Sequence, residues 1–352
     1  MTAFERRRIG RTGVTVSAMG FGGVGLGQRV GTIGEAQADA TVHAAYAADI
    51  RYFDTSPWYG HGLSEHRTGH VLRTLPRDDF VLSTKVGRIF HRPENPATFS
   101  TGQWRGGLPF DYRRDYTAAG VQRSYEDSLL RLGMNRVDML FVHDIDQRHM
   151  GPENSYGGVG GIEGAFWQLE CGGGWRRLSD MRASGEIGAI GFGCNYANMI
   201  PRFLERFDPD VFLVAMPYTL LDQDALDEAF PMCQERGISI VIGSVFSSGI
   251  LATGIRDDAV YGYNAPPPAV VEKVRAITAV CARHGTTVQA AALQFPLLHP
   301  VVAAIIPGAM APGQVTENVS RLGEPVPRDC WNELKSEGLL RRDAPTGQGR
   351  PN

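Results

Sequence analysis

The sequence has few cysteines and no excess of positive charge. Its five cysteines in 352 residues lie far apart and form no CxxC pair, which argues against a disulfide framework and predicts reduced thiols. Lys and Arg number 35 against 38 Asp and Glu, and the net charge of −3 provides no basic surface for nucleic acid. We therefore expect neither a disulfide-rich secreted protein nor a nucleic-acid binder.

Segments that direct a chain into or across a membrane are also missing. The opening MTAFERRRIG is polar and charged and lacks the apolar core of a signal peptide. No apolar stretch approaches the roughly 20 residues of a membrane span. These features predict a cytoplasmic protein with no membrane partner.

Short apolar runs alternate with longer amphipathic segments, a pattern typical of β/α units around a parallel sheet. Strands are predicted at 16–22, 51–55, 80–85, 137–143, 188–193, 211–216, 238–243 and 301–306. Helices are predicted near 35–48, 64–75, 118–133, 174–185, 196–207, 222–236 and 268–297, the last as two helices. The fold class is therefore α/β, a single (β/α)8 barrel of the TIM type over residues 1–340, with 341–352 as a flexible tail.

Such a barrel takes about 250 residues, which leaves roughly 100 for insertions. A short N-terminal hairpin is predicted within 4–13, with its turn at Arg11, Thr12 and Gly13. Long loops follow strands at 88–116, 144–164 and 244–267. Because loops after strand C-termini cover the active face of a barrel, these loops are expected to form substrate walls. Each could equally be a surface insertion without function.

A glycine-rich stretch, GFGGVG at residues 20–25, fits the G-x-G-x-x-G fingerprint of dinucleotide-binding folds. That fingerprint must open directly into a helix, whereas here further glycines follow and helical sequence begins only near Glu35. In a chain with 43 glycines, such a match is more often chance. We interpret the stretch as a loop after a buried strand.

Four polar residues at or just after predicted strand ends are the first candidates for catalysis: Asp54, Tyr59, Lys85 and His143. A partly desolvated Lys85 needs a counter-ion, and Asp54 ends the adjacent strand. A nearby ammonium would lower the pKa of Tyr59 from about 10 and make it a general acid or base toward a carbonyl or alcohol oxygen. From spacing alone, a structural ion pair beside a rim tyrosine is slightly favoured.

The segment HDIDQRH allows a different interpretation, in which His143, Asp144, Asp146 and His149 are metal ligands in a hydrolase barrel. Metal-dependent barrels draw ligands from several strands, and no second strand end here is rich in histidine. We therefore expect no metal.

Several separated motifs resemble the aldo-keto reductase superfamily, in order and over nearly the whole chain. RRRIGRTGVTVSAMGFGG resembles its hairpin and first strand, RYFDTSPWYG its Asp and Tyr signature, STKVG its Lys segment, SLLRLGMNRVDMLFVHD its His segment, and IPGA with QVTENV its adenosine-binding segment. The resemblance implies that Asp54, Tyr59, Lys85 and His143 are a catalytic tetrad. It thereby overturns the preference for a structural ion pair.

The resemblance also implies a nicotinamide cofactor extended across the C-terminal mouth of the barrel, with GFGGVG near the nicotinamide. The implied contacts are Gly22, Asn195, Ser244, Phe246, Pro307, Gly308, Gln314, Glu317 and Asn318. Two positions depart from the family pattern. Ala215 and Met216 stand where many members have Gln, and Gly243 and Ser244 stand where an aromatic often stacks on the nicotinamide.

The segment 307–318 contains neither Arg nor Lys, the residues that bind a 2′-phosphate. Glu317 would repel a phosphate but could accept a hydrogen bond from a ribose hydroxyl. NAD is therefore favoured over NADP, and Arg321 is the residue that could reverse this preference.

Details such as HD-x-D, YTLLDQ and SSGILA most closely resemble the branch of aldose 1-dehydrogenases acting on L-fucose, L-galactose or D-threo-aldoses, together with pyridoxal 4-dehydrogenase. The resemblance implies a small-molecule carbonyl or hemiacetal substrate that gives hydride to NAD and leaves a lactone. Trp58, Phe90 and Trp104 could line the substrate ring or simply anchor loops. Alternatives are a broad NADPH-dependent aldehyde or ketone reductase and a non-enzymatic NAD(H)-binding subunit. The oligomeric state stays open.

Overall fold

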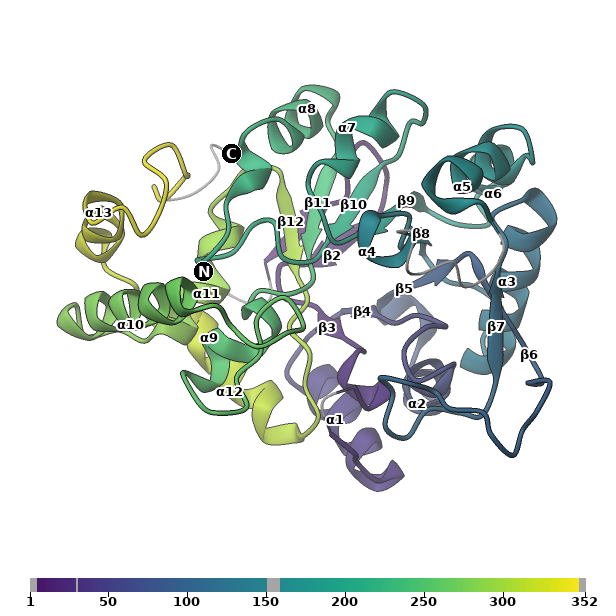
Figure 1. Cartoon of the computed structure of the whole chain (residues 1–352), viewed down its shortest axis with the longest axis horizontal. Coiled ribbons are helices and arrows are strands. Elements are labelled where there is room, and N and C mark those ends of the chain that lie inside the picture. Colours follow the sequence, from purple (N-terminus) through teal and green to yellow (C-terminus); the bar gives the residue numbers. More distant parts are fainter. Residues whose placement is uncertain (1–4, 30, 151–158, 348–352) are drawn as a thin grey trace.

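A computed structural model describes residues 5–29, 31–150 and 159–347 (Figure 1). Its main sheet has eight parallel strands: β3 (Phe21–Gly22), β4 (Tyr52–Asp54), β5 (Val81–Val86), β8 (Met139–His143), β9 (Ala189–Cys194), β10 (Val211–Val214), β11 (Ser239–Ile242) and β12 (Val302–Ile305). They follow one another in chain order across the sheet. Gly20 N donates to Ile305 O at 2.8 Å and Ile305 N to Ala18 O at 2.9 Å, so the first and last strands meet. The predicted (β/α)8 barrel is confirmed.

Seven of the eight predicted strands begin and end within two residues of the observed bounds. The first prediction, 16–22, is wrong as one strand. Residues Thr15–Ser17 form β2, which pairs antiparallel with β1 (Arg6–Arg8), and only β3 belongs to the barrel sheet. An apolar run alone does not reveal that its first half pairs with a different partner from its second half.

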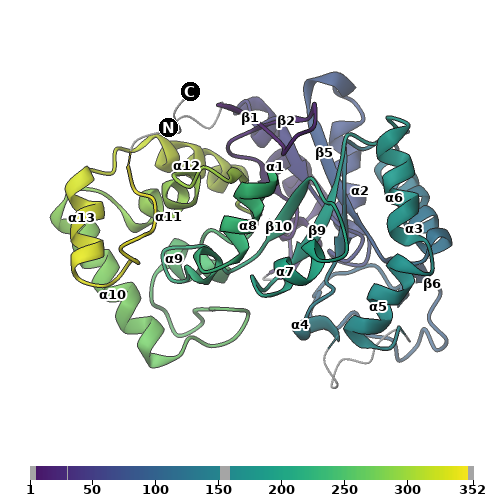
Figure 2. The same cartoon turned by 90° about the horizontal axis from the view of Figure 1, so that it is seen from above.

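The N-terminal hairpin β1–β2 closes one end of the barrel. Ile9 and Val16 are fully buried and join the cluster of side chains that fills the barrel interior, which includes Met139, Phe141 and Val241. The predicted turn is present, because Thr12 N donates to Ile9 O at 3.0 Å and Ile9 N to Val14 O at 2.9 Å. The short helix α4 (Gln147–Met150) lies at the opposite end of the molecule (Figure 2).

The helices surround the sheet (Figures 1 and 2). They include α1 (Glu35–Ala47), α2 (Leu63–Leu72), α3 (Ala118–Leu132), α6 (Gly174–Ala183), α7 (Met199–Leu204), α8 (Ala229–Arg236), α10 (Pro268–Arg283), α11 (Val288–Leu297), α12 (Pro312–Gly323) and α13 (Arg328–Ser336). The predicted segment 268–297 is indeed two helices, which are separated at Gly285 with φ 65°. The predicted helix 222–236 is shorter than expected and begins at Ala229.

Each predicted loop contains structure of its own. The segment 88–116 holds a hairpin of β6 (Arg88–His91) and β7 (Asp111–Arg114). The segment 144–164 holds α4 and the start of α5 (Gly161–Glu170), and part of it lies outside the described residues. The segment 244–267 includes α9 (Ile250–Thr253).

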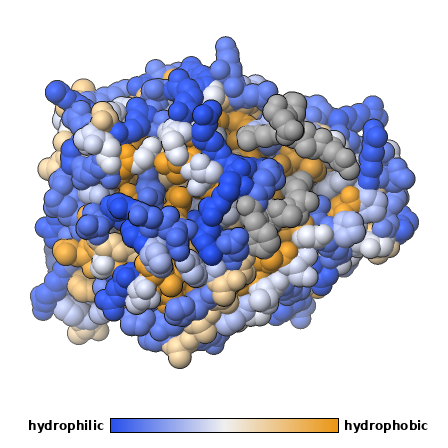
Figure 3. Space-filling view, turned by 180° about the vertical axis from the view of Figure 1, so that it is seen from behind, coloured by the Kyte–Doolittle hydropathy of each residue, from blue (hydrophilic) through white to orange (hydrophobic). Residues whose placement is uncertain are grey.

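In the predicted tail, Arg341 N donates to Gln223 Oε1 at 3.3 Å and Ala344 is buried, while 348–352 lie outside the described residues. Hydrophilic residues dominate the face seen in Figure 3, with hydrophobic ones between them. None of the helices in the described ranges combines the length and apolar character needed to cross a bilayer.

The role of the β1–β2 hairpin in closing the barrel can be tested by its effect on stability. Replacing Ile9 with Ala leaves a cavity at the closed end of the barrel and should lower the free energy of unfolding by about 2–5 kcal/mol in urea denaturation. The neighbouring Arg11→Ala removes only an exposed ion pair with Asp208 and should change it by less than about 0.5 kcal/mol. Equal effects of the two changes would contradict the buried role of Ile9.

Candidate active site

A buried ion pair joins the ends of β4 and β5. Lys85 Nζ donates to Asp54 Oδ2 at 2.7 Å and to Thr55 O at 2.8 Å, and Ser83 Oγ donates to Asp54 Oδ1 at 2.7 Å. The Asp54 and Lys85 side chains are each 1% exposed. Parallel pairing places Asp54 opposite Ser83, so the sheet register itself brings these groups together.

Burial changes the acidity of both partners. It raises the pKa of Asp54 and lowers the pKa of Lys85, because each charge has lost water, while their mutual attraction opposes both changes. The Lys85 ammonium therefore releases a proton more readily than an exposed lysine.

Tyr59 lies in the turn after β4 and is brought next to this pair. Lys85 Nζ is 4.7 Å from the centre of the Tyr59 ring. The predicted lowering of the Tyr59 pKa is nevertheless wrong for the protein alone. Burial raises the pKa well above 10, and the carboxylates of Asp54 and Asp144 act in the same direction. In the protein alone, Tyr59 is a neutral phenol.

His143 ends β8 and lies across from Tyr59, with the two ring centres 6.0 Å apart. Its Nδ1 lies 3.0 Å from the guanidinium of Arg88 and 3.1 Å from Ser56 Oγ. Burial lowers the pKa of His143 well below 6.5, and the positive charges of Arg88 and Lys85 lower it further against the opposing effect of Asp144. The imidazole is therefore neutral at physiological pH.

These groups meet at one small cavity of about 70 Å³. Of the predicted site residues it is lined by Trp58, Tyr59, Lys85, Trp104, His143 and Asn195, with Asp54 behind Lys85. Phe90 does not line it. Its ring stacks on His61 with centres 5.6 Å apart.

Sequence analysis missed three lining residues from distant loops. Tyr263 lies between two cations, with the guanidinium of Arg29 4.2 Å and that of Arg148 4.4 Å from its ring centre. Arg29 also faces the Trp104 ring at 5.8 Å. No local motif marks these residues, because their contact joins segments more than a hundred residues apart.

Asn195 fits the implied contact with a nicotinamide carboxamide. Its backbone N and its Nδ2 donate to Asp146 Oδ2 at 3.0 and 2.8 Å, which fixes the orientation of the amide. Within the described ranges, no group donates to its side-chain oxygen. This oxygen, in the same cavity as Tyr59 and His143, is placed to accept from an amide NH₂.

The glycine-rich stretch is a loop, as interpreted. A short 3-10 turn at Gly25–Gly27 follows β3, and α1 begins only at Glu35. Gly22 pairs with Gly308 across the barrel seam, and Gly22 N donates to Pro307 O at 3.2 Å. A Cβ on Gly22 would lie 2.6 Å from Ile306 O, so this close approach requires glycine.

The remaining implied cofactor contacts lie in the loops after β11 and β12. Ser244 Oγ accepts from Ser248 N at 3.1 Å, and Phe246 packs against the core. Gln314 Oε1 accepts from Met310 N at 2.7 Å. Glu317 and Asn318 lie on α12, one turn or more past its start. None of these lines the small cavity around Tyr59, so the implied cofactor contacts extend beyond it.

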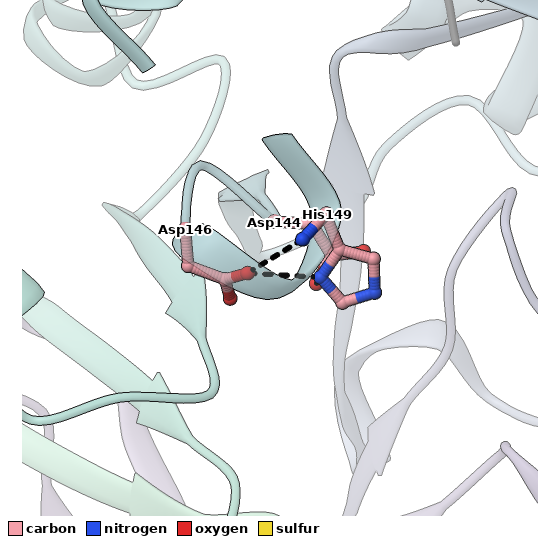
Figure 4. A group of neighbouring side chains, drawn as sticks. All are labelled: Asp144, Asp146 and His149. Carbon is pink, nitrogen blue, oxygen red and sulfur yellow. Dashed lines mark hydrogen bonds and ion pairs between the residues drawn. The ribbon is translucent and has the colours of Figure 1, made fainter. Parts of the chain in front are cut away.

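Asp144, Asp146 and His149 form the one group in the described part of the chain whose carboxylate and imidazole atoms lie close enough to hold a metal, within 4.8 Å of one another (Figure 4). Protein groups already occupy their ligand atoms. Asp144 Oδ2 accepts from Arg88 at 2.7 Å, and Asp146 Oδ1 lies 3.0 Å from His149 Nδ1. Burial opposes ionisation of Asp146, but its hydrogen bonds with His149 and Asn195 lower its pKa to about 2. The cluster is a satisfied network beside the cavity.

At the C-terminal mouth of the barrel, a tyrosine, a lysine and a histidine surround one cavity. This arrangement is compatible with proton transfer in an oxidoreductase. Comparison with known families agrees, because the aldo/keto reductase family matches residues 18–337. The chain belongs to the aldo/keto reductase family. It is therefore an oxidoreductase that acts on CH–OH groups and uses a nicotinamide cofactor.

Individual members of the family are similar to this chain over nearly its whole length. The chain is 37% identical over 349 residues to pyridoxal 4-dehydrogenase of Microbacterium luteolum, covering 97% of this chain and 99% of the relative. It is 35% identical over 334 residues to D-threo-aldose 1-dehydrogenase of a Pseudomonas species, covering 93% and 96%. An aldo-keto reductase structure from Bacillus halodurans, AKR11C1 in its holo form, superposes with a TM-score of 0.70 at 23% identity, covering 96% and 97%.

The buried pair predicts a non-additive response to substitution. Lys85→Met leaves the Asp54 carboxylate buried without its cation and should destabilise the protein by about 3–5 kcal/mol in urea denaturation. The double variant Asp54→Asn with Lys85→Met removes both charges and should lose less than the single variant. A double variant that loses the sum of the two single effects would argue against the pair.

Proposed function

We propose that the protein is an NAD-dependent dehydrogenase that removes hydride from the hemiacetal or alcohol carbon of an aldose or of pyridoxal, giving a lactone. The convergence of Tyr59, Lys85 and His143 on one cavity with the Asn195 amide carries this proposal. The relatives named for pyridoxal and D-threo-aldose oxidation support the substrate class. When bound, the nicotinamide supplies the hydride acceptor.

Each of four side chains has a different role in the reaction at the substrate oxygen: Asp54, Tyr59, Lys85 and His143. In oxidation, Tyr59 acts as a base after it has lost its own proton, an ionisation that the Lys85 ammonium near its ring favours, and the phenolate then accepts the hydroxyl proton and becomes a neutral phenol. Neutral His143 donates to the same oxygen and orients it. Asp54 holds Lys85 in place. In the reverse direction, the neutral Tyr59 phenol donates its proton to a carbonyl.

Aromatic walls suit a ring-shaped substrate. Trp58 and Trp104 meet edge to face with ring centres 5.7 Å apart and both line the cavity. The buried Nε1 of Trp104 has no acceptor among the described residues, which leaves a donor for a substrate hydroxyl or ring heteroatom. Arg29, whose pKa burial lowers, adds a second donor on the same wall.

The preference for NAD over NADP is supported by the surroundings of Arg321 on α12. Its guanidinium lies 3.1 Å from a Glu324 carboxylate oxygen and 3.5 Å from one of Glu317. Two carboxylates therefore already pair with Arg321, the cation on α12 that could bind a 2′-phosphate. The resulting site favours a ribose hydroxyl.

The first test is the initial rate of NADH or NADPH formation from NAD⁺ or NADP⁺ with L-fucose, L-galactose, D-arabinose and pyridoxal. We expect turnover with NAD⁺ that Tyr59→Phe reduces by at least about 10²–10⁴-fold. Tyr46→Phe, which removes an exposed hydroxyl bonded to Asp79, should keep full activity. No oxidation of any of the three sugars or of pyridoxal, together with NADPH-driven reduction of simple aldehydes, would instead favour the alternative of a broad aldehyde or ketone reductase.

The pH dependence follows from the raised pKa of Tyr59. Oxidation needs the ionised phenol as a base, so its kcat/KM should rise with pH through the range above 7. Reduction needs the neutral phenol, so its kcat/KM should stay level over that range and fall only at higher pH. An oxidation profile that falls as pH rises from 7 to 9 would exclude Tyr59 as the base.

Cofactor choice can be tested on α12. Glu317→Lys replaces a repelling charge with an attractive one and should raise the ratio of kcat/KM for NADP⁺ to that for NAD⁺ by about tenfold or more, equivalent to about 1.4 kcal/mol. Glu235→Lys makes the same charge change at an exposed position of α8 and serves as the control. If both variants leave the ratio unchanged, Glu317 does not select the cofactor.

A further inference from the structure

We propose that Arg88 is a positioning residue for His143: it donates to Nδ1 and thereby fixes the imidazole as the tautomer that carries its proton on Nε2. Arg88 Nη1 lies 3.0 Å from His143 Nδ1. A guanidinium has donors only, so Nδ1 must be the acceptor and a neutral ring must hold its hydrogen on Nε2. Ser56 Oγ, 3.1 Å from the same nitrogen, must then donate as well.

The tautomer matters for the proposed function, on which this role rests. With Nδ1 occupied, Nε2–H is the group that His143 can offer to a substrate oxygen in the cavity it shares with Tyr59. The opposite tautomer would present a lone pair there and would repel the oxygen. Arg88 touches neither substrate nor cofactor in this account and acts only through His143.

The burial of Arg88 is hard to explain by packing alone. The residue is 2% exposed, and arginine is rarely so buried unless its charge is compensated. Arg88 Nη2 donates to Asp144 Oδ2 at 2.7 Å, and the guanidinium lies 4.5 Å from the Trp58 ring centre. Arg88 therefore links the histidine, its own counter-ion and an aromatic wall of the cavity.

The backbone on both sides is shaped to make this link. Gly87 turns the chain from β5 into β6 with φ 113°, and a Cβ there would lie 2.1 Å from the Tyr116 ring. Asp144 has φ 60°, a left-handed conformation that a residue other than glycine seldom adopts. Such a conformation persists only where surrounding contacts hold it, here the bond from Asp144 N to Gly193 O at 2.9 Å and the Arg88 pair.

One other charged group around His143 favours the same tautomer. Asp144 Oδ1 lies 3.4 Å from Nε2, and a carboxylate oxygen can only accept a hydrogen bond from that nitrogen. Lys85 and His149 act on the ring through their charge, and Tyr59 faces it at 6.0 Å between ring centres. Among the described residues, Arg88 is the charged group that directly contacts Nδ1.

The test reads the tautomer directly, without substrate. The full-length protein is labelled with ¹⁵N in its nine histidine rings, and the His143 signals are assigned by their loss in His143→Asn. In the wild type we expect an unprotonated Nδ1 and a protonated Nε2. In Arg88→Met, the ¹⁵N chemical shifts of both ring nitrogens should move toward the averaged values of mixed tautomers, or toward those of the doubly protonated ring near neutral pH.

Two further variants keep the outcome interpretable. The double variant Arg88→Met with Asp144→Asn leaves no unpaired buried charge and should fold while showing the same loss of tautomer preference. Arg123→Met removes an arginine that is 60% exposed on α3 and pairs with Asp127, and should leave the His143 signals unchanged.

Kinetics provide a second readout. In the double variant, kcat should fall by about 10–100-fold with little change in the KM for NAD⁺. An Nε2–H tautomer that persists without Arg88 would overturn the proposal, whatever the activity. If the enzyme oxidises none of the sugars or pyridoxal while the tautomer shifts as expected, the dehydrogenase proposal fails and the role of Arg88 in setting the tautomer stands.

Discussion

The ion pair between Lys85 and Asp54 is the constraint on which the site depends. Two charges that are 1% exposed inside a barrel are tolerated only when they neutralise each other and their remaining polar atoms are bonded, here through Ser83 and the Thr55 carbonyl. Those bonds require β4 and β5 in one register. The same register fixes the turn that carries Tyr59 over the ammonium.

A second buried pair, Arg88 with Asp144, contacts His143. Tyr59 and His143 line the cavity beside these two pairs, and burial keeps both of them neutral in the protein alone. In the proposed reaction, two uncharged hydrogen-bonding groups act on one substrate oxygen, while the charges beside them are compensated in pairs. This arrangement lets a proton move without leaving an isolated charge in the cavity.

Sequence patterns predicted the barrel because its strands are marked locally by apolar runs and most of its helices by an amphipathic period. They also predicted that Tyr59, Lys85 and His143 meet at one cavity, since strand ends in a barrel share one face. They could not give the Tyr59 pKa, which depends on water exclusion and on Asp144 from another strand. Nor could they find Arg88, Arg29 or Tyr263, whose partners are set by how loops fold over the barrel mouth.

The proposed function requires hydride transfer from a hydroxyl-bearing carbon to a nicotinamide at this cavity, with Tyr59 as the group that takes up the proton. The most direct test is isotope transfer: an aldose deuterated at C1, or pyridoxal deuterated at its aldehyde carbon, is oxidised with NAD⁺ and the reduced cofactor is analysed by mass spectrometry. If hydride moves directly to the cofactor, we expect deuterium in the nicotinamide ring, a lactone as product and a slower rate for the labelled substrate. Reduced cofactor without deuterium would contradict it.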